Sequence, residues 1–391
     1  MANIPVNPAV LLSARKDHAG LSLDAAAEKL GISVSHLAEL EAGTRRPSYT
    51  LLLKMATHYG ISLNYLVLPN PIPFRKPDDY RTIANRHALF THATRIAIRT
   101  AYALQDNIDE LVTDSERTYI EQRLPVVTLT EEIEELATRE RDRLGIQVED
   151  QLLWKTPFEA FRQWRIHLER EGILVYLFNM SIGDCRGFSI LAPIPAVIVN
   201  DREPTYLARI FTLLHEYGHI LLRKPGISDE SRGSNVEWFC NRVAAAILMP
   251  TNLLREVLLL PPDPIEVDWQ DKQIARAANR MHVSQQALAI RLETLGYARD
   301  KFAERYNFGK PFQEEKAKKK SKGPSVSWAE KRLRRLGLGY SSRVLTALER
   351  RDISEVSAYR MLNAKPAHFA EIQNLIELER AAYAPTTTAE R

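Results

Sequence analysis

The first part of the chain is a series of apolar segments separated by glycines. Residues 8–66 are rich in alanine and leucine. Glycines punctuate these segments at positions 20, 31, 43 and 60. Glycine tolerates the backbone conformation that ends a helix, so this rhythm predicts short helices joined by tight turns. We therefore expect a compact all-α domain over residues 1–68.

The stretch Pro69–Phe74 ends this domain, because proline lacks the amide donor of a helix and restricts the residue before it. From Asp79 to about Gly145, apolar residues recur three and four apart among many charges, which predicts amphipathic helices. We interpret residues 69–150 as a helical connector. The pattern assigns no function to it.

After another amphipathic helix the pattern changes to short runs rich in β-branched and aromatic residues. These runs cover residues 172–178, 187–191 and 196–200. They predict three strands of one small sheet. Helical spacing returns at 205–223 and again at 235–249, where Pro250 ends it. Residues 151–310 are thus predicted to form a domain of mixed α and β structure.

The last part of the chain begins with a run of lysines, Lys316–Lys322, of low complexity. Such a run cannot bury enough apolar surface to fold, so residues 311–327 are predicted to be a basic linker. Contact with a nucleic-acid backbone and simple solvation both remain open for it. A small helical domain is expected over residues 328–391, and ligand sensing, dimerisation and substrate binding all stay open as its role.

Composition narrows the class of protein. Apolar residues make up 45% of the chain and charged residues 26%, which is typical of globular proteins. The formal net charge is only +4, so affinity for nucleic acid depends on local clusters of Lys and Arg. We expect a cytoplasmic protein without membrane contact, since we find no signal peptide and no long apolar run. Two widely spaced cysteines, Cys185 and Cys240, fit a reducing compartment.

The most informative motif is His215-Glu216-Tyr217-Gly218-His219, within a predicted helix and flanked by apolar residues. Helix positions four apart lie one turn apart on one face, so His215 and His219 can reach one ion. Neutral imidazoles suit zinc, and Glu216 lies near enough to take a proton from zinc-bound water. An ordinary buried pair of histidines is the alternative interpretation.

A catalytic zinc ion needs a third protein ligand, and Glu237 on the next predicted helix is the best candidate. Asn241 lies one turn further on, where it can hydrogen-bond a histidine ligand. The alternative for Glu237 is an exposed carboxylate favoured by the helix dipole. A donor that stabilises an oxyanion is also needed. Four residues stay open for that role: Arg186, Tyr206, Tyr217 and His282.

Over about residues 158–297 the chain resembles the ImmA/IrrE family of metallopeptidases. In that family the His-Glu-x-x-His helix precedes a second helix that bears a glutamate and ends in Leu-Met-Pro, here Leu248-Met249-Pro250. The resemblance implies a zincin-like domain in which zinc is bound by three residues and Glu216 activates water for peptide hydrolysis. The three implied ligands are His215, His219 and Glu237.

Two further points follow from this resemblance. Tyr217 departs from the family pattern, in which leucine is frequent at this position. The strand that ends at Asn200 is expected to bind an extended substrate peptide by β-augmentation.

The N-terminal segment has the spacing of a helix-turn-helix. Ser22 can cap a helix from Leu23 to Leu30, and Gly31 permits the turn. Either Ser33 or Ser35 can cap the next helix, which extends to Glu41. Residues 8–66 resemble the XRE family of DNA-binding domains.

That resemblance places the second helix of the motif in the major groove. The residues implied to face bases lie at its start: Ser33, Val34, Ser35 and His36, with Glu39 beside them. Arg45 and Arg46 would approach phosphates. Because Glu39 and Glu41 weaken the attraction to phosphate, binding of a protein partner stays open as an alternative.

The expected fold is mostly α and multidomain: an all-α helix-turn-helix domain, a helical connector, an α+β zincin-like peptidase domain with a small sheet, and a helical C-terminal domain. The predicted function is zinc-dependent (Zn²⁺) endoproteolysis of a partner protein, a transcriptional repressor. The expected partners also include double-stranded DNA and a second copy of the chain. The alternative is a DNA-binding regulator or antitoxin-like protein whose metal site is not catalytic.

Overall fold

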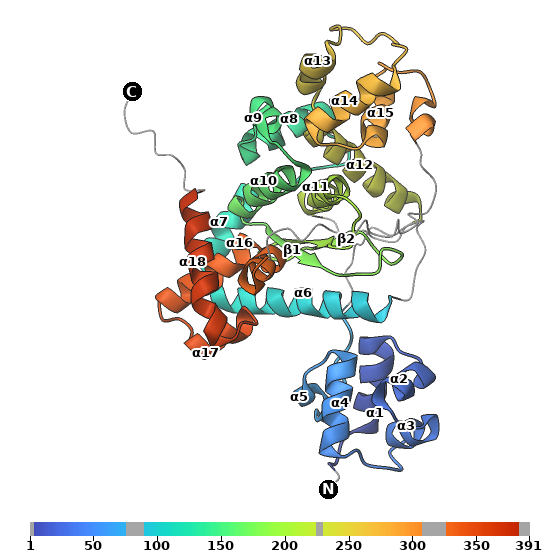
Figure 1. Ribbon diagram of the computed structural model, residues 1–391, viewed down its shortest axis with the longest axis vertical. Coiled ribbons are helices and arrows are strands. Elements are labelled where there is room, and N and C mark those ends of the chain that lie inside the picture. The colour runs from blue at the N-terminus through green and yellow to red at the C-terminus, as the bar shows by residue number, and fades with distance from the viewer. Residues whose placement is uncertain (1–3, 76–89, 224–229, 307–325, 383–391) are drawn as a thin grey trace.

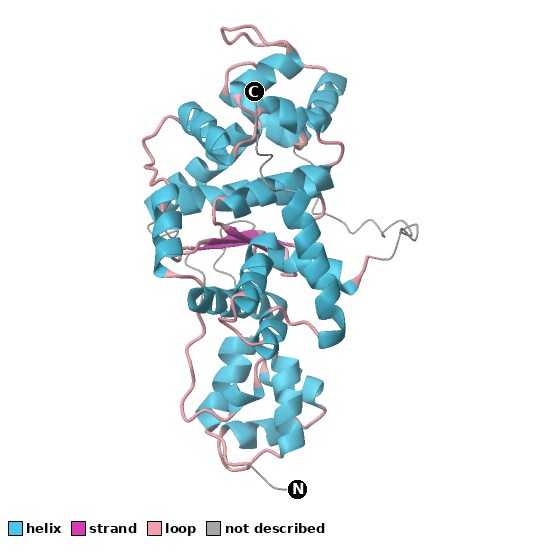
Figure 2. Ribbon diagram, turned by 90° about the vertical axis from the view of Figure 1, so that its left-hand side faces the viewer, coloured by secondary structure: helices cyan, strands magenta, loops and turns pink. Residues whose placement is uncertain are grey.

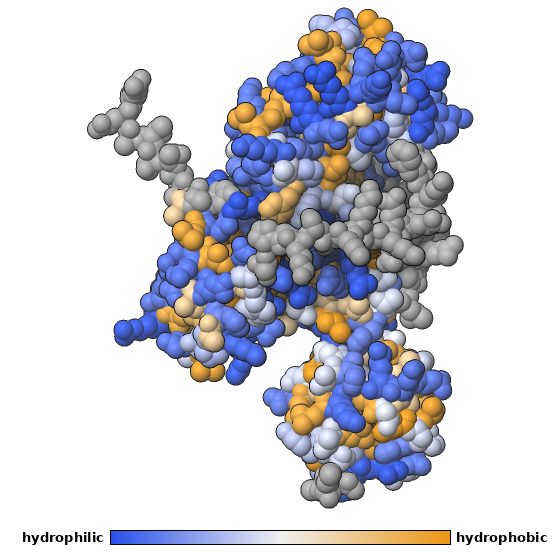
Figure 3. Space-filling view, in the orientation of Figure 1, coloured by the Kyte–Doolittle hydropathy of each residue, from blue (hydrophilic) through white to orange (hydrophobic). Residues whose placement is uncertain are grey.

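The computed structural model describes residues 4–75, 90–223, 230–306 and 326–382. Helices dominate the described residues, and a single three-stranded sheet lies among them with helices on both of its faces (Figures 1 and 2). The prediction of a mostly α multidomain fold with a small sheet is confirmed. Among the described helices, none combines the length and apolar composition that a membrane crossing requires. The visible face is largely hydrophilic, with apolar residues gathered most clearly on the N-terminal domain (Figure 3).

The N-terminal domain is a group of short helices around its own core. Its helices are α1 (Pro8–Ser13), η1 (Ala14–Ala19), α2 (Leu23–Leu30), α3 (Val34–Glu41), α4 (Tyr49–Tyr59) and α5 (Leu63–Leu66). Ser22 caps α2, and of the two serines considered for α3 it is Ser33 that accepts the cap hydrogen bond. Gly31 and Gly60 end α2 and α4 in the left-handed conformation, which costs glycine little.

Helix α6 (His92–Leu111) lies above the N-terminal domain in Figure 1 and contacts it through two side chains. Arg99 Nη2 donates to the carbonyl oxygens of Tyr59 and Gly60, both at 2.9 Å, where α4 ends. His92 Nδ1 lies 2.8 Å from the carbonyl oxygen of Ala19 at the end of η1. Because the last carbonyl groups of a helix have no partner within it, these side-chain contacts join the two parts through the ends of two helices.

The helices of the expected connector share a core with the sheet. They are α6, α7 (Asp114–Arg123), α8 (Ile133–Leu144) and α9 (Val148–Leu153). Their buried residues, Ile98, Leu136 and Leu144 among them, belong to one cluster with the strands. Gln105 of α6 also donates to the carbonyl oxygen of Ile194 at 2.7 Å. The connector is therefore packed into the same body as the sheet.

The sheet has the order β1-β3-β2, with β1 (Leu174–Phe178), β2 (Gly187–Ile190) and β3 (Ala196–Asn200). Strand β3 pairs in parallel with β1 and antiparallel with β2. The expectation that the strand ending at Asn200 binds a substrate peptide is wrong, because this central strand already has a partner on each side. Within the described residues β2 pairs only with β3 and forms one edge of the sheet.

Two helical layers cover the sheet. On one side lie α10 (Pro157–Arg170), α11 (Tyr206–Leu222) and α12 (Glu230–Leu248), followed by α13 (Thr251–Leu258), α14 (Asp271–Met281), α15 (Gln285–Thr294) and the short η2 (Phe302–Tyr306). On the other side are α6 and the C-terminal α16 (Trp328–Glu349), α17 (Glu355–Met361) and α18 (Pro366–Ala382). Residues 311–325 of the expected basic linker lie outside the described residues.

Helix α16 packs directly on β1, so residues 328–382 share the core of the sheet. The ring of Tyr340 meets the edge of Tyr176, with ring centroids 5.9 Å apart. Gly337 interrupts α16 with a φ of 81°, and a Cβ atom there would lie 2.8 Å from the carbonyl oxygen of Val175. Glycine is therefore required for this close approach to the sheet.

Candidate metal centre

Helix α11 places the His-Glu-x-x-His motif in the middle of the protein. Thr205 caps its first turn by accepting a hydrogen bond from Ala208 N at 3.1 Å. The helix then lies between the sheet and α12, which buries nearly every side chain of its second half. His215, Glu216 and His219 are all buried there. Buried polar groups of this kind are stable only with partners, which makes the site chemically distinctive.

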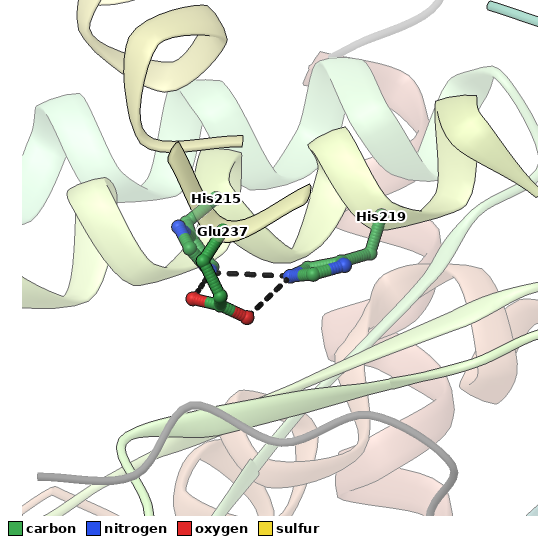
Figure 4. A group of neighbouring side chains, drawn as sticks. All are labelled: His215, His219 and Glu237. Carbon is green, nitrogen blue, oxygen red and sulfur yellow. Dashed lines mark hydrogen bonds and ion pairs between the residues drawn. The ribbon is translucent and has the colours of Figure 1, made fainter. Parts of the chain in front are cut away.

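Three possible ligand atoms converge beside α11 (Figure 4). Nε2 of His215 and Nε2 of His219 lie 3.2 Å apart. Glu237 of α12 approaches both nitrogens: its Oε2 lies 3.4 Å from Nε2 of His215, and its Oε1 lies 3.4 Å from Nε2 of His219. Two ligand atoms on a tetrahedral zinc ion, each about 2.0 to 2.1 Å from the metal, lie about 3.3 to 3.4 Å apart. The spacing and chemistry of these donors therefore fit a tetrahedral metal site.

The charge on Glu237 suits a ligand. Burial raises the pKa of the Glu237 carboxyl, but hydrogen bonds and the charges of His215 and His219 outweigh burial and hold that pKa well below its usual range. The carboxylate therefore stays ionised. Its side chain is 32% exposed, whereas the side chains of the two histidines are almost fully buried. The site is thus open to solvent on the side of Glu237, as a site with a water ligand requires.

Asn241 contacts His215 at the ring nitrogen that does not face the other proposed ligands. Its Oδ1 lies 3.0 Å from Nδ1 of His215, one turn after Glu237 on α12. A proton on Nδ1 donates to this oxygen, which leaves the lone pair of Nε2 for a metal ion.

Family comparisons agree with this geometry. Residues 168–293 match the model of a peptidase family described as the IrrE N-terminal-like domain, and residues 11–66 match a helix-turn-helix model. The chain therefore contains an IrrE-like peptidase domain and a helix-turn-helix domain. Both resemblances found in the sequence are confirmed, and the IrrE-like domain is of metallopeptidase type. None of the curated proteins matches the chain closely enough to count as a relative.

The IrrE-like domain brings α11 and α12 into close contact through a glycine of the motif. A Cβ atom on Gly218 would lie 3.2 Å from the Cα, Cβ and Sγ atoms of Cys240, so any larger residue pushes the helices apart. Since α11 carries His215 and His219 and α12 carries Glu237, the separation of these helices sets the distances among the three proposed ligands, which we call the ligand triangle.

The end of α12 is held by three buried side chains from distant segments. Arg141 Nη1, Gln151 Nε2 and Arg291 Nε donate to successive carbonyl oxygens, two at the C-terminus of α12 and one on the residue that follows it. The acceptors are Ile247, Leu248 and Met249, at 2.8, 3.0 and 3.1 Å. These carbonyls have no partner within the helix, so the donors satisfy groups that would otherwise be buried without hydrogen bonds.

Strand β2 approaches α11 at Glu216, and sequence reasoning did not assign a role to the glycine that makes this possible. A Cβ atom on Gly187 would lie 2.6 Å from Thr212 Cγ2, 2.8 Å from the Ile198 carbonyl oxygen and 3.3 Å from Glu216 Cγ. A glycine that opens a predicted strand was the only signal in the sequence.

The four residues left open for oxyanion stabilisation are all engaged in other contacts. Arg186 pairs with Glu203 at 2.8 Å, and His282 Nε2 lies 2.8 Å from the Trp154 carbonyl oxygen. The ring of Tyr206 packs against Phe158 and Phe161. The hydroxyl of Tyr217 contacts Glu140 and Arg143 of α8. Tyr217, the departure from the family pattern, thus ties α11 to α8.

In the helix-turn-helix domain, Val34 and Ser35 are exposed on α3 and His36 is half-buried. Ser33 accepts a hydrogen bond from His36 N at 3.2 Å as the cap of α3. Arg45 and Arg46 are exposed after the helix, and Arg45 pairs with Glu39 at 3.3 Å. This exposed pair partly neutralises a cation that the sequence assigned to phosphate contact.

Proposed function

We propose that the chain is a zinc-dependent endopeptidase that regulates transcription by cleaving a partner protein, a transcriptional repressor. The observation that carries this proposal is the convergence of His215 and His219, on the helix that also bears Glu216, with Glu237 of α12, at distances of 3.2 to 3.4 Å between their nitrogen and oxygen atoms. The helix-turn-helix match supports the regulatory part, because it gives the same chain a means to reach DNA or a related domain on a repressor.

Each residue of the site has a defined role in this proposal. His215, His219 and Glu237 would hold zinc, which supplies Lewis-acid activation of a water molecule. Asn241 keeps Nδ1 of His215 protonated and its ring oriented. Glu216 takes a proton from the attacking water and passes it to the amide nitrogen as the peptide C–N bond breaks. One product then ends in a carboxylate and the other begins with an amine.

The edge strand β2 is the proposed platform for the substrate. It is the edge of the sheet that runs against α11 near Glu216, as the contacts around Gly187 indicate. An extended peptide that pairs with β2 places its backbone along the site, and hydrogen bonds to the strand bind it without regard to side chains.

For the helix-turn-helix domain we propose that α3 enters the major groove. Val34, Ser35 and His36 then face the bases, with Ser33 at the start of the helix, while Arg45 and Arg46 contact phosphates. The Glu39 pair with Arg45 predicts modest affinity for DNA.

The test is co-expression with the candidate repressor encoded beside the gene of this protein. Wild type and the surface control Glu135→Gln should cleave the repressor. Glu216→Gln should bind zinc to the same stoichiometry, measured by metal analysis, and leave the repressor intact. Undiminished cleavage by Glu216→Gln would remove the assigned base. DNA binding that survives metal chelation, together with no cleavage by wild type, would favour the regulator with a non-catalytic metal site.

A further inference from the structure

The C-terminal helices α17 and α18 repeat the local sequence of the helix-turn-helix in the N-terminal domain. Residues 353–373 align with residues 21–41 without a gap. Identical residues stand at these corresponding positions: Ser22 and Ser354, Ala26 and Ala358, Leu30 and Leu362, His36 and His368, Ala38 and Ala370, and Glu39 and Glu371. They include the helix cap, a buried alanine of the first helix and the last apolar residue before the turn.

The two pairs of helices also share their backbone geometry. Each first helix begins with a serine whose Oγ accepts a backbone amide three residues on, at 3.2 Å. Each turn has one residue in the left-handed conformation, Gly31 with a φ of 68° and Asn363 with a φ of 45°. The next residue donates its amide to the carbonyl oxygen five residues back, at 3.1 Å for Ile32 and 2.8 Å for Ala364. The second helix begins two residues later in both, so α17 and α18 form a second helix-turn-helix.

Helix α18 exposes the face that a recognition helix presents to DNA. Phe369 and Ile372 are buried at the positions of Leu37 and Leu40, which hold α3 to its own domain. The exposed residues at the start of the helix are Lys365, Pro366, Ala367, Ala370 and Glu371. Since α18 lies at the left edge of the molecule in Figure 1, this face is accessible to a duplex.

A helix-turn-helix is also a packing unit, so charge decides whether it suits DNA. The second motif is less acidic than the first, because Arg360 stands in place of Glu28 and Lys365 in place of Ser33. From the start of α16 the charge becomes basic: residues 326–373 contain nine lysines and arginines against five acidic residues, whereas residues 8–66 contain six against five.

Helix α16 brings part of this charge to the turn. The ring of Trp328 at its start stacks on His368 of α18, with ring centroids 5.1 Å apart. Arg332 Nε donates to the carbonyl oxygen of Leu362 in the turn, at 2.6 Å. Four exposed cations lie on these segments, and none forms an ion pair within the described parts of the chain: Lys331, Arg335, Arg360 and Lys365. Three exposed acids lie on α17, α18 and the loop before them: Asp352, Glu355 and Glu371.

We propose that α17 and α18 are a second DNA-binding unit, in which the start of α18 enters the major groove of double-stranded DNA and the four cations contact phosphates. Pro366, Ala367 and Ala370 then face the groove, where small side chains let the helix approach closely. These side chains offer no hydrogen bonds to base edges, and His368 is occupied by Trp328. Binding therefore depends on phosphate contacts and has little sequence preference.

The test measures binding of a labelled DNA duplex of random sequence to the full chain, by fluorescence anisotropy over a range of salt concentrations. Arg45→Gln/Arg46→Gln reduces the contribution of the N-terminal domain and serves as the parent, which should still bind the duplex. Adding Arg360→Gln/Lys365→Gln should weaken binding at least about tenfold. It should also lower the slope of log affinity against log salt by about 2, since two phosphate contacts are lost.

Two matched controls separate this mode from general charge effects. Adding Lys155→Gln/Lys272→Gln to the parent removes the same charge from exposed positions outside the C-terminal helices and should leave affinity and slope unchanged. Ala367→Glu places an acid at the start of α18 and should weaken binding, whereas Ala381→Glu places it near the end of the same helix and should not.

No duplex binding by the parent at low salt would overturn the proposal. So would equal affinity and slope for the two double charge variants, or equal effects of the two alanine substitutions. Tighter binding of a single-stranded RNA than of the duplex would assign the surface to another nucleic acid and would also overturn it. Removal of metal with a chelator should not change duplex binding, so this result is independent of the proposed peptidase activity.

Discussion

Replacing Asn241 by alanine should weaken zinc binding while all three proposed ligands remain. Asn241 Oδ1 lies 3.0 Å from His215 Nδ1, and this contact selects the tautomer whose Nε2 carries a lone pair. Without it, His215 spends part of its time with a proton on the nitrogen that faces the ion, and its ring loses an orienting contact. Removing such a hydrogen bond behind a metal ligand typically lowers affinity about 10- to 100-fold, or about 1.4 to 2.7 kcal/mol.

The measurement is competition for zinc between the purified protein and a chromophoric chelator. Asn241→Asp keeps an acceptor oxygen at the same place and should bind zinc at least as tightly as wild type. Asn252→Ala serves as the matched control, because this asparagine is exposed and, within the described parts of the chain, its side chain hydrogen-bonds the backbone amide of Leu253 alone. An affinity of Asn241→Ala within twofold of wild type would refute the reasoning, as would an aspartate variant that is as weak as the alanine variant.

Three further predictions concern the supports of the site. Gly218→Ala brings a methyl group to 3.2 Å from Cys240 and should cost about 1 to 3 kcal/mol in urea denaturation. Gly183→Ala, where a Cβ atom would lie 3.8 Å from Ser181 Oγ, should cost little. Arg291→Met leaves a buried carbonyl at the end of α12 without its donor and should cost about 2 to 4 kcal/mol in the same assay. Arg99→Ala removes both hydrogen bonds to the end of α4, so limited proteolysis should release the helix-turn-helix domain faster than from wild type.

Local features of the fold were predictable from the sequence, because they depend on neighbouring residues. The serine caps of α2 and α3 and the glycine between these helices follow from short-range hydrogen bonding and backbone freedom. The strand predicted at 196–200 has the bounds of β3, Ala196–Asn200. Its run of five buried residues, which β1 shares, is typical of strands covered on both faces, but it does not distinguish the central strand from the edge strand.

How these elements pack together was harder to predict from the sequence, because a pattern of buried positions does not show which segment covers them. The apolar face of α16 predicts burial, but its contact with β1 depends on Gly337, whose close approach to Val175 involves residues far apart in the chain. The candidate metal centre also has one part that the sequence predicts and one part that depends on packing. The spacing of His215 and His219 is set by one helix, whereas the place of Glu237 depends on how closely α12 packs on α11.

The residues that hold the metal centre extend well beyond the segment that matches the IrrE-like family. The match covers residues 168–293 and includes all three proposed ligands. Yet Arg141 and Gln151, which hold the end of α12, come from α8 and α9, and Glu140 of α8 contacts Tyr217 of the motif helix. Because these donors are buried and serve groups that have no other partner within their helices, the geometry of the ligand triangle depends on the connector helices. The connector therefore acts as a structural part of the IrrE-like domain, whose supporting residues begin before the matched segment does.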